Sequence, residues 1–236
     1  MTEKNSIGWQ KQPNKLNIQG TIEKVISDIT KEDIELIGSG RTDAGVHALG
    51  QVANFKTNST IPIEKFAIAI NSRLKKSIII KKAEEVPDRF HSRYNCKQKT
   101  YRYVINNSET GSAIYRNLEY NIKMPLDVNK MQEAANYFVG EHDFTGFKAS
   151  GTSSKSSVRT IYSAKVIKDN ERIAIELTGN GFLYNMVRII AGTLVEVGLG
   201  KIKPEEITGI IESKDRQKAG KTLPPYGLYL VEVNYN

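Results

Sequence analysis

The residues between positions 38 and 51 are of types that could carry out chemistry on a bound ligand. The segment reads Gly-Ser-Gly-Arg-Thr-Asp-Ala-Gly-Val-His-Ala-Leu-Gly-Gln and holds a single carboxylate, Asp43. Its glycines permit unusual backbone angles and let a ligand approach closely. Arg41 and Asp43 point to one side of an extended chain, and an adjacent arginine favours the ionised carboxylate. Asp43 is therefore a candidate nucleophile or general base. The same pair could instead stiffen a turn, and the residues alone leave both interpretations open.

Other catalytic sites fit the sequence less well. Residues 38–43 resemble a dinucleotide fingerprint, but Asp43 stands at the third glycine position, where pyrophosphate would have to lie. The Gly-Lys-Ser/Thr ending of a P-loop is missing, and a glycosidase would need a second, opposed carboxylate. Cys96, near His91, is more typical of a small packing residue than of a thiol nucleophile. His142 follows a predicted helix end, where a histidine commonly caps carbonyls.

Positive charge gathers in two stretches that contain no acidic residue, residues 89–108 and 144–168. Cations of this kind position a nucleic-acid backbone. The second stretch also contains a small, polar loop over residues 149–157, which can follow a phosphate backbone. The cations that we expect to bind a nucleic acid are Arg93, Lys99, Arg102, Lys155 and Arg159.

Aromatic residues are interleaved with the cations of the first stretch. They are Phe90, Tyr94, Tyr101 and Tyr103. Aromatic faces stack on exposed bases. Tyrosines that alternate with charges are also typical of ordinary half-buried strands, so each one alone has two interpretations.

Hydrophobic periodicity predicts the elements that position these residues. In the first part of the chain, the Asp43 loop joins two short strands that follow a helix. Pro62 stands at a natural first helical position of a second helix. The expected order is helix, strand, strand, helix, strand, strand over residues 17–29, 34–38, 50–56, 62–74, 77–86 and 99–105.

The second part of the chain mixes helices and strands in the same way. Asp127 is the predicted cap of its first helix, and Gly198 and Gly200 end a long apolar helix. The expected elements are a helix over 127–139, strands over 160–168 and 172–178, helices over 183–197 and from Pro204, and a strand over 227–234. We therefore expect an α+β fold of two ferredoxin-like halves, residues 1–107 and 108–236, with a seam at 106–116.

Composition limits the class of protein. The 236 residues carry 34 Lys and Arg against 26 Asp and Glu, a net charge of +8, with one cysteine and three histidines. One cysteine excludes a disulfide scaffold and a zinc site of several thiolates, so we expect no metal. No apolar run reaches the ~18–20 residues of a membrane span, and no signal-peptide pattern opens the chain. We expect a cytoplasmic protein with a polyanionic partner.

The segment Gly40-Arg-Thr-Asp-Ala-Gly-Val-His-Ala48 resembles the signature loop of the TruA family of tRNA pseudouridine synthases. Further segments resemble that family in the right order along nearly the whole chain. They are Gly8–Pro13, Phe90–Arg93, Lys99–Tyr103, Phe138–Phe144, Ser157–Ile161, Gly179–Arg188 and Gly227–Leu230.

The resemblance implies a function. Members of that family isomerise uridines 38 to 40 of the tRNA anticodon stem-loop to pseudouridine, without a cofactor, and act as homodimers. Asp43 matches their catalytic aspartate, and Arg41 and Arg188 match active-site arginines. Tyr101 matches the tyrosine that stacks on the target base, and Leu228 matches an apolar residue of the pocket. The resemblance also implies mixed or antiparallel sheets and a basic active-site cleft between two RRM-like halves.

Some alternatives stay open. Asp43 could add to uracil C6, attack ribose C1′ or abstract a ribose proton. A non-catalytic RNA-binding protein or RNA chaperone on the same scaffold is the second candidate function, and an aspartate-dependent nucleoside hydrolase is the third. Members of the family usually begin with a strand before the Gly-Trp-Gln segment, whereas only seven residues precede Gly8 here. We therefore expect the first sheet to be one strand short.

Overall fold

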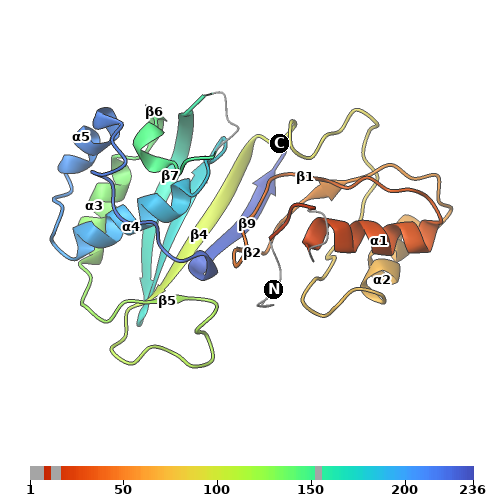
Figure 1. Cartoon of the computed structure of the whole chain (residues 1–236), viewed down its shortest axis with the longest axis horizontal. Coiled ribbons are helices and arrows are strands. Elements are labelled where there is room, and N and C mark those ends of the chain that lie inside the picture. The colour runs from red at the N-terminus through yellow and green to blue at the C-terminus, as the bar shows by residue number, and fades with distance from the viewer. Residues whose placement is uncertain (1–7, 12–16, 152–155) are drawn as a thin grey trace. The chain divides into compact units, whose positions relative to one another are not determined.

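The computed structural model describes residues 8–11, 17–151 and 156–236, and it has an α+β fold (Figure 1). Contacts divide the chain into two compact units, residues 1–96 with Tyr235 and residues 97–234 with Asn236. The expected boundary at residue 107 differs from this division. The strand that ends there pairs along both edges with strands of the second unit and therefore belongs to it. The expectation of a missing first strand falls on residues 1–7, outside the described residues.

The first unit is built around two helices and their apolar faces. Helix α1 (Ile18–Thr30) begins where the Asn17 side chain accepts a hydrogen bond from the Gly20 amide, and helix α2 is Ile63–Asn71. Both helices were predicted, although Pro62 lies at the cap of α2 and not inside its first turn. Their buried faces form one core, made of Trp9, Ile18, Ile22, Ile26, Ile34, Leu36, Phe66 and Ile70.

The strands of the first unit are shorter than predicted. Strand β1 is Ile37–Gly38, β2 is His47–Ala48 and β3 is Ala53–Asn54, with β1 and β3 antiparallel. Ahead of β1, the Leu36 amide donates to Glu23 Oε1 (3.0 Å) and the Leu36 carbonyl accepts from Gln19 Nε2 (2.8 Å). Because side chains of α1 take both backbone groups of Leu36, the β1 ladder begins only at Ile37.

The predicted strand over residues 77–86 was wrong, since these residues form no strand. The reason is again a side chain that replaces a strand partner. The Asn71 amide group bonds both the N–H and the C=O of Ile80, each at 2.8 Å. The apolar run Ile78–Ile80 favours a strand in the sequence, but no strand forms over these described residues.

The second unit is a sheet with helices packed on it. Its strands β9, β4, β8, β7 and β6 lie in that order and are antiparallel, and β5 pairs with β4 in parallel, so the sheet is mixed. The strand bounds are Gln98–Asn106 (β4), Tyr120–Asn121 (β5), Gly140–Asp143 (β6), Val158–Asp169 (β7), Arg172–Gly179 (β8) and Leu228–Asn234 (β9). The predictions of β4, the β7–β8 hairpin and β9 were confirmed.

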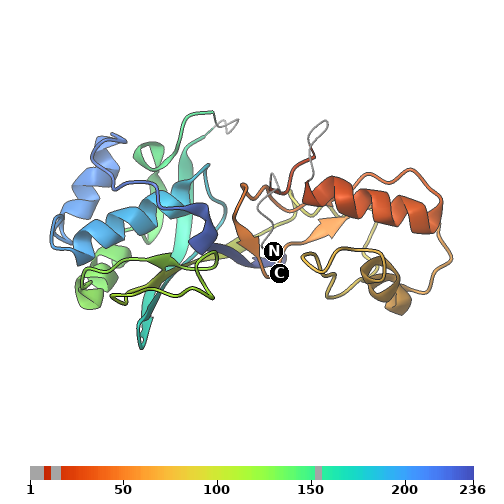
Figure 2. The ribbon, with the colours of Figure 1, turned by 60° about the horizontal axis from the view of Figure 1, so that its bottom comes forward.

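The helices of the second unit also match their predictions in place and type. They are α3 (Val128–Asn136), α4 (Met186–Gly198) and α5 (Glu206–Ser213), with short 3₁₀ turns at Thr145–Phe147 and Pro225–Gly227. The Asp127 side chain caps α3 by accepting from the Lys130 amide (3.1 Å). Figures 1 and 2 show α3 and α4 on one face of the sheet. Strand side chains on that face are fully buried, including Tyr103, Ile105, Ile175 and Leu177.

A strap of residues 219–223 crosses helix α4 at very short range. A Cβ atom on Gly192 of α4 would lie 1.9 Å from the Lys221 carbonyl oxygen, and one on Gly220 would lie 2.5 Å from the Thr193 nitrogen. The Thr193 hydroxyl accepts from the Gly220 amide (2.9 Å). Two glycines thus allow backbone to meet backbone, which positions the Leu223 carbonyl beside α4.

Replacing Gly192 by alanine should destabilise the protein by about 1–3 kcal/mol, because the added methyl group displaces the strap. The matched control is Gly209→Ala in α5, where nothing lies within 4 Å of the added Cβ. Alanine at that helical position should stabilise by about 0.5–1 kcal/mol. Urea unfolding of both variants measures the difference, and equal stability of the two would contradict the close approach.

Candidate functional site

The Asp43 loop joins β1 to β3 and is closed by backbone and side-chain hydrogen bonds. The Ser39 amide donates to the Val52 carbonyl (2.8 Å), and Gln51 Nε2 donates to the Gly40 carbonyl (2.9 Å). Inside the loop, the Val46 amide donates to the Asp43 carbonyl (3.1 Å). The structure leaves Arg41 exposed and Asp43 half-buried. The loop therefore presents its one carboxylate from a fixed backbone.

A second segment, Gly8 and Trp9, packs against the Asp43 loop. The Trp9 amide donates to the Thr42 carbonyl (3.0 Å), and a Cβ atom on Gly8 would lie 2.5 Å from that same carbonyl oxygen. Gly8 also has a positive φ of 90°, which disfavours any other residue. The Trp9 ring covers Gly38, where a Cβ would lie 2.5 Å from it. Gly8 and Trp9 are therefore supports of the loop that chemical reasoning about single residues missed.

In the second unit, three predicted site residues project from one face of the sheet. Tyr101 pairs with Leu230, and Tyr103 pairs with Leu228 across β4 and β9. Residues directly opposite each other share a face, and alternate residues of β4 do so as well. Lys99, Tyr101 and Leu228 therefore lie on the face that also carries the buried Tyr103. Leu228 is itself buried, and Tyr101 is half-buried.

Arg188 reaches the same face from the first turn of α4. Its Nη1 donates to Asn185 Oδ1 (2.7 Å) and its Nε donates to the Leu223 carbonyl (2.6 Å), so the strap orients the guanidinium. Burial raises the pKa of Tyr103, and the positive charge of Arg188 partly offsets that rise. The positive charge of Arg188 therefore acts on β4, the strand that also carries Tyr101.

An aromatic contact fixes the Tyr101 ring. Phe182 lies edge-on to it, with ring centroids 5.2 Å apart and an interplanar angle of 79°. Gly179 lies next to this pair: a Cβ there would be 3.4 Å from the Phe182 ring and only 2.7 Å from the Thr160 carbonyl oxygen. Phe182 belongs to the segment Gly179–Arg188 that resembles the family, but the sequence alone did not predict its contact with Tyr101.

Arg159 and Arg102 have different surroundings. A Cβ on Gly181 would lie 3.7 Å from Arg159 Nε, which places Arg159 beside the loop that carries Phe182, and burial lowers the pKa of Arg159. Arg102 projects from the opposite face of β4 to Tyr101. There its Nη2 lies 2.5 Å from Glu176 Oε1 in an ion pair. The structure therefore does not bring Arg102 together with Tyr101.

The predicted site residues are divided between the two units. Arg41, Asp43 and Arg93 belong to the first, and Lys99, Tyr101, Arg102, Arg159, Arg188 and Leu228 belong to the second. Arg93 is exposed. Lys155 lies outside the described residues.

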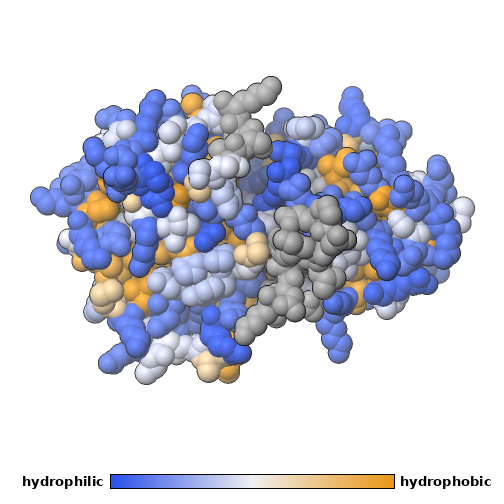
Figure 3. All heavy atoms as spheres, in the orientation of Figure 1, coloured by the Kyte–Doolittle hydropathy of each residue, from blue (hydrophilic) through white to orange (hydrophobic). Residues whose placement is uncertain are grey.

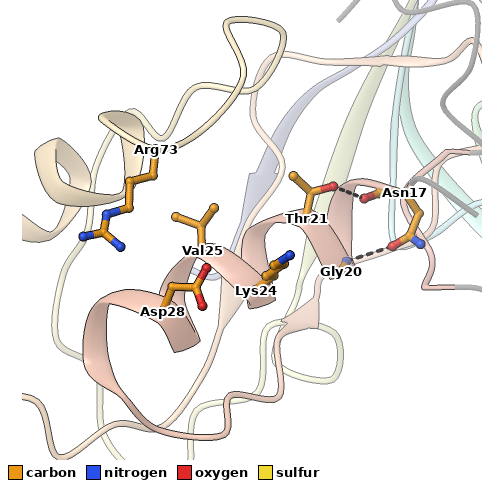
Figure 4. Close-up of a pocket in the computed structure, with 7 residues that line it drawn as sticks. All are labelled: Asn17, Gly20, Thr21, Lys24, Val25, Asp28 and Arg73. Atoms are coloured by element: carbon orange, nitrogen blue, oxygen red, sulfur yellow. Dashed lines mark hydrogen bonds between the residues drawn. The ribbon is translucent and has the colours of Figure 1, made fainter.

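A hollow of about 410 Å³ lies beside α1, lined by Asn17, Gly20, Thr21, Lys24, Val25, Asp28 and Arg73 (Figure 4). Figure 4 shows the Asp28 carboxylate between Lys24 and Arg73. None of these lining residues is a predicted site residue, and none belongs to the Asp43 loop.

Other site types were searched for in the described part of the chain. There, no group of three or more His, Cys, Asp or Glu side chains is placed to hold a metal ion. Over the same residues, no helix has both the length and the apolar character needed to cross a membrane. In Figure 3, hydrophilic residues cover most of the visible face and apolar ones form small patches.

Comparison with known proteins decides the family. A sequence model described as tRNA pseudouridine synthase matches residues 4–95 and 134–236 of this chain. The chain belongs to the tRNA pseudouridine synthase family. It is therefore an isomerase, an enzyme that rearranges bonds within a single substrate molecule.

Relatives in this family match almost end to end. The tRNA pseudouridine synthase A of Caldicellulosiruptor bescii is 57% identical over 228 residues, which cover 97% of this chain and 93% of the relative. That of Caldicellulosiruptor saccharolyticus is 57% identical over 231 residues, covering 98% and 95%. That of Acetivibrio thermocellus is 54% identical over 228 residues, covering 97% and 93%. The resemblance to the TruA family is thus confirmed.

For this pseudouridine synthase, the buried Tyr103 and the half-buried Tyr229 predict how stability responds to alkaline pH. Burial raises the pKa of Tyr103 far above its ordinary value, and raises that of Tyr229 to about 12. Their unfolded pKa is about 10. The stabilisation that these two tyrosines contribute is therefore fully present below pH ~10. As the pH rises from there toward the folded pKa, the free energy of unfolding falls by about 1.4 kcal/mol per pH unit for each group.

Tyr103→Phe should reduce this alkaline loss of stability. At pH 7 the variant loses the hydrogen bond from the Tyr103 hydroxyl to the Pro224 carbonyl (2.8 Å), at a cost of about 1 kcal/mol. Urea unfolding at several pH values from 7 to 11 measures both effects. An unchanged slope above pH 10 would contradict the assignment to Tyr103.

Proposed function

We propose that this enzyme converts uridine to pseudouridine at positions 38, 39 and 40 of the tRNA anticodon stem-loop, with Asp43 as its catalytic carboxylate. The observation that carries the proposal is the intact loop Gly40–Ala48, whose half-buried Asp43 is held on a hydrogen-bonded backbone. The TruA resemblance supplies the target positions. The names of the relatives, tRNA pseudouridine synthase A, support tRNA as the substrate.

The proposed reaction conserves atoms and electrons. The N1–C1′ bond of uridine breaks, the uracil rotates, and a C5–C1′ bond forms; a proton leaves C5 and one is taken up at N1. An isomerisation of this kind needs no co-substrate, so the proposal includes no cofactor. Asp43 serves as the nucleophile or base for bond cleavage.

Other residues bind and orient the nucleotide in this proposal. Arg41 and Arg188 supply fixed positive charge to the phosphates or to Asp43. Tyr101, braced by Phe182, stacks on the target base, and Leu228 adds apolar surface that excludes water. A uridine inside the stem must leave the base stack at a cost of about 2–4 kcal/mol. Arg93, Lys99, Arg159 and Lys155 contribute backbone contacts that offset this cost.

The same proposal includes the finer features that the TruA resemblance implies. They are two ferredoxin-like halves with a basic cleft, a homodimer, and action in the cytoplasm. Support for them is the family membership itself, together with the α+β character of the chain.

Replacing Asp43 should separate catalysis from binding. Asp43→Asn keeps the size of the side chain and removes its charge, so turnover should fall by on the order of a thousandfold or more while tRNA affinity is largely retained. The assay incubates unmodified tRNA transcript with enzyme and maps pseudouridine by carbodiimide treatment and primer extension. Equal turnover of Asp43→Asn and wild type would refute the proposal, and tRNA binding without any wild-type product would favour a non-catalytic RNA-binding protein.

Two cations on opposite faces of β4 provide a second test. Lys99 shares the face of Tyr101, whereas Arg102 is ion-paired to Glu176 on the other face. Lys99→Gln should weaken tRNA binding and lower the slope of log affinity against log salt by about one, because one phosphate contact is lost. Arg102→Gln should change that slope little, although the sequence alone nominated both residues. Equal slope changes in both variants would contradict this choice of face.

A further inference from the structure

Four aromatic residues interleave with the cations of residues 89–103, and the structure gives them different surroundings. Tyr103 is fully buried, and its hydroxyl donates to the Pro224 carbonyl. Tyr101 packs against Phe182, and the Phe90 ring packs against Tyr235 with centroids 5.0 Å apart. Tyr94 is 75% exposed. Of the four, Tyr94 is the one whose ring is mainly open to solvent.

A tight turn holds Tyr94 in place. Ser92, which is fully buried, donates from its hydroxyl to the Ile37 carbonyl (2.6 Å), and its amide donates to Asn54 Oδ1 (2.9 Å). These two bonds fasten the turn to β1 and β3. The Ser92 carbonyl also accepts a hydrogen bond from the Tyr235 hydroxyl (2.7 Å). The turn is thus anchored on the residue that lies two positions before Tyr94.

The ring of His91 organises the turn from within. Its Nδ1 accepts hydrogen bonds from the amides of Arg93 (3.2 Å) and Tyr94 (3.3 Å), and the His91 amide donates to Asn95 Oδ1 (2.6 Å). The His91 and Tyr94 rings lie 4.1 Å apart with an interplanar angle of 37°. Contact with one ring therefore limits the rotation of the exposed tyrosine.

A cation lies next to this ring pair. The Arg93 guanidinium carbon is 6.0 Å from the centroid of Tyr94, at the outer range of a cation–π contact. Tyr94, His91 and Arg93 together form a small surface, the Tyr94 platform, that offers an aromatic face and a positive charge. A nucleotide has the complementary groups, a π-face on its base and a negative phosphate.

We propose that the Tyr94 platform binds an unpaired nucleotide of the RNA substrate, with the base stacked on Tyr94 and the phosphate near Arg93. That this RNA is tRNA rests on the proposed function. A protein partner fits less well, because Tyr94 lies between the exposed polar residues Arg93 and Asn95 and not in a contiguous apolar patch. The absence of acidic residues over positions 89–108 also favours a polyanion.

Tyr94→Ala should weaken the binding of unmodified tRNA by about tenfold, since one stacked base is lost. Tyr94→Phe and Tyr94→Trp should bind as wild type, because both keep an aromatic face. The control is Tyr137→Ala, which removes another exposed tyrosine, 37% exposed, near Glu133 and Glu141. Filter binding at several salt concentrations measures affinity, and thermal unfolding confirms that each variant is folded.

Salt dependence distinguishes stacking from charge. Tyr94→Ala should lower affinity without changing the slope of log affinity against log salt, whereas Arg93→Gln should lower the slope by about one. In Tyr94→Trp, tRNA should quench the new indole fluorescence, measured against the buried Trp9 of the wild type. Quenching by a short single-stranded RNA but not by an RNA duplex would support an unpaired base as the ligand.

Two results would overturn the platform: wild-type affinity in folded Tyr94→Ala, or no change of indole fluorescence when Tyr94→Trp is saturated with tRNA. Both readouts measure binding and not product. They therefore remain informative if wild-type enzyme forms no pseudouridine, which would refute the proposed function instead.

Discussion

The pairing of β4 along both of its edges is the constraint on which the arrangement of the second unit depends. Residues 99–106 pair with β8, and residues 98–103 pair with β9. A strand bonded on both sides cannot rotate, and a slip by one residue would move every side chain to the opposite face. The burial of Tyr103 and Ile105 under the helices therefore also determines where Lys99, Tyr101 and Arg102 project. Packing of the core, and not electrostatic attraction, therefore selects Lys99 as the cation that shares a face with Tyr101.

The first unit follows a different rule, because its strands are only two residues long. Side-chain amides and a carboxylate take the place of neighbouring strands, as with Gln19 and Glu23 at Leu36 and Asn71 at Ile80. The Glu23 carboxylate is buried and also lies 2.8 Å from Lys11 Nζ, so the group that satisfies the backbone is itself paired with a cation. Between β1 and β3, residues 39–52 then form a loop in which the one strand is the two-residue β2. A glycine-rich loop can then bend sharply while the backbone of Trp9 and Val52 holds it in place.

These two rules explain how much the sequence could predict. Helices and long strands depend on apolar periodicity, which is visible in the sequence, and α1, α3, α4, β4, β7, β8 and β9 were all predicted close to their observed bounds. Strand ends and the false strand over 77–86 depend on single long-range side-chain bonds, such as that from Asn71 to Ile80, for which the sequence carries no local signal. The residues of the candidate site were nominated by motif and charge. Contacts such as that of Phe182 with Tyr101, and the opposite placement of Arg102, depend on strand register and were accessible only from the structure.

Ion pairing shows why net charge is a poor guide to individual contacts. Arg102 with Glu176, Arg172 with Glu119 and Lys214 with Asp143 lie within 2.9 Å of their partners. Each pair removes one cation and one anion from the long-range field, so the surplus of +8 is unchanged while fewer cations can supply it. Asp143, whose pKa the Lys214 ammonium lowers, stands immediately before the acid-free stretch 144–168. Because its charge is directed to Lys214, it does not oppose the cations of that stretch. The basic character of a segment is therefore set by where the neighbouring acids find partners, as much as by the cations it contains.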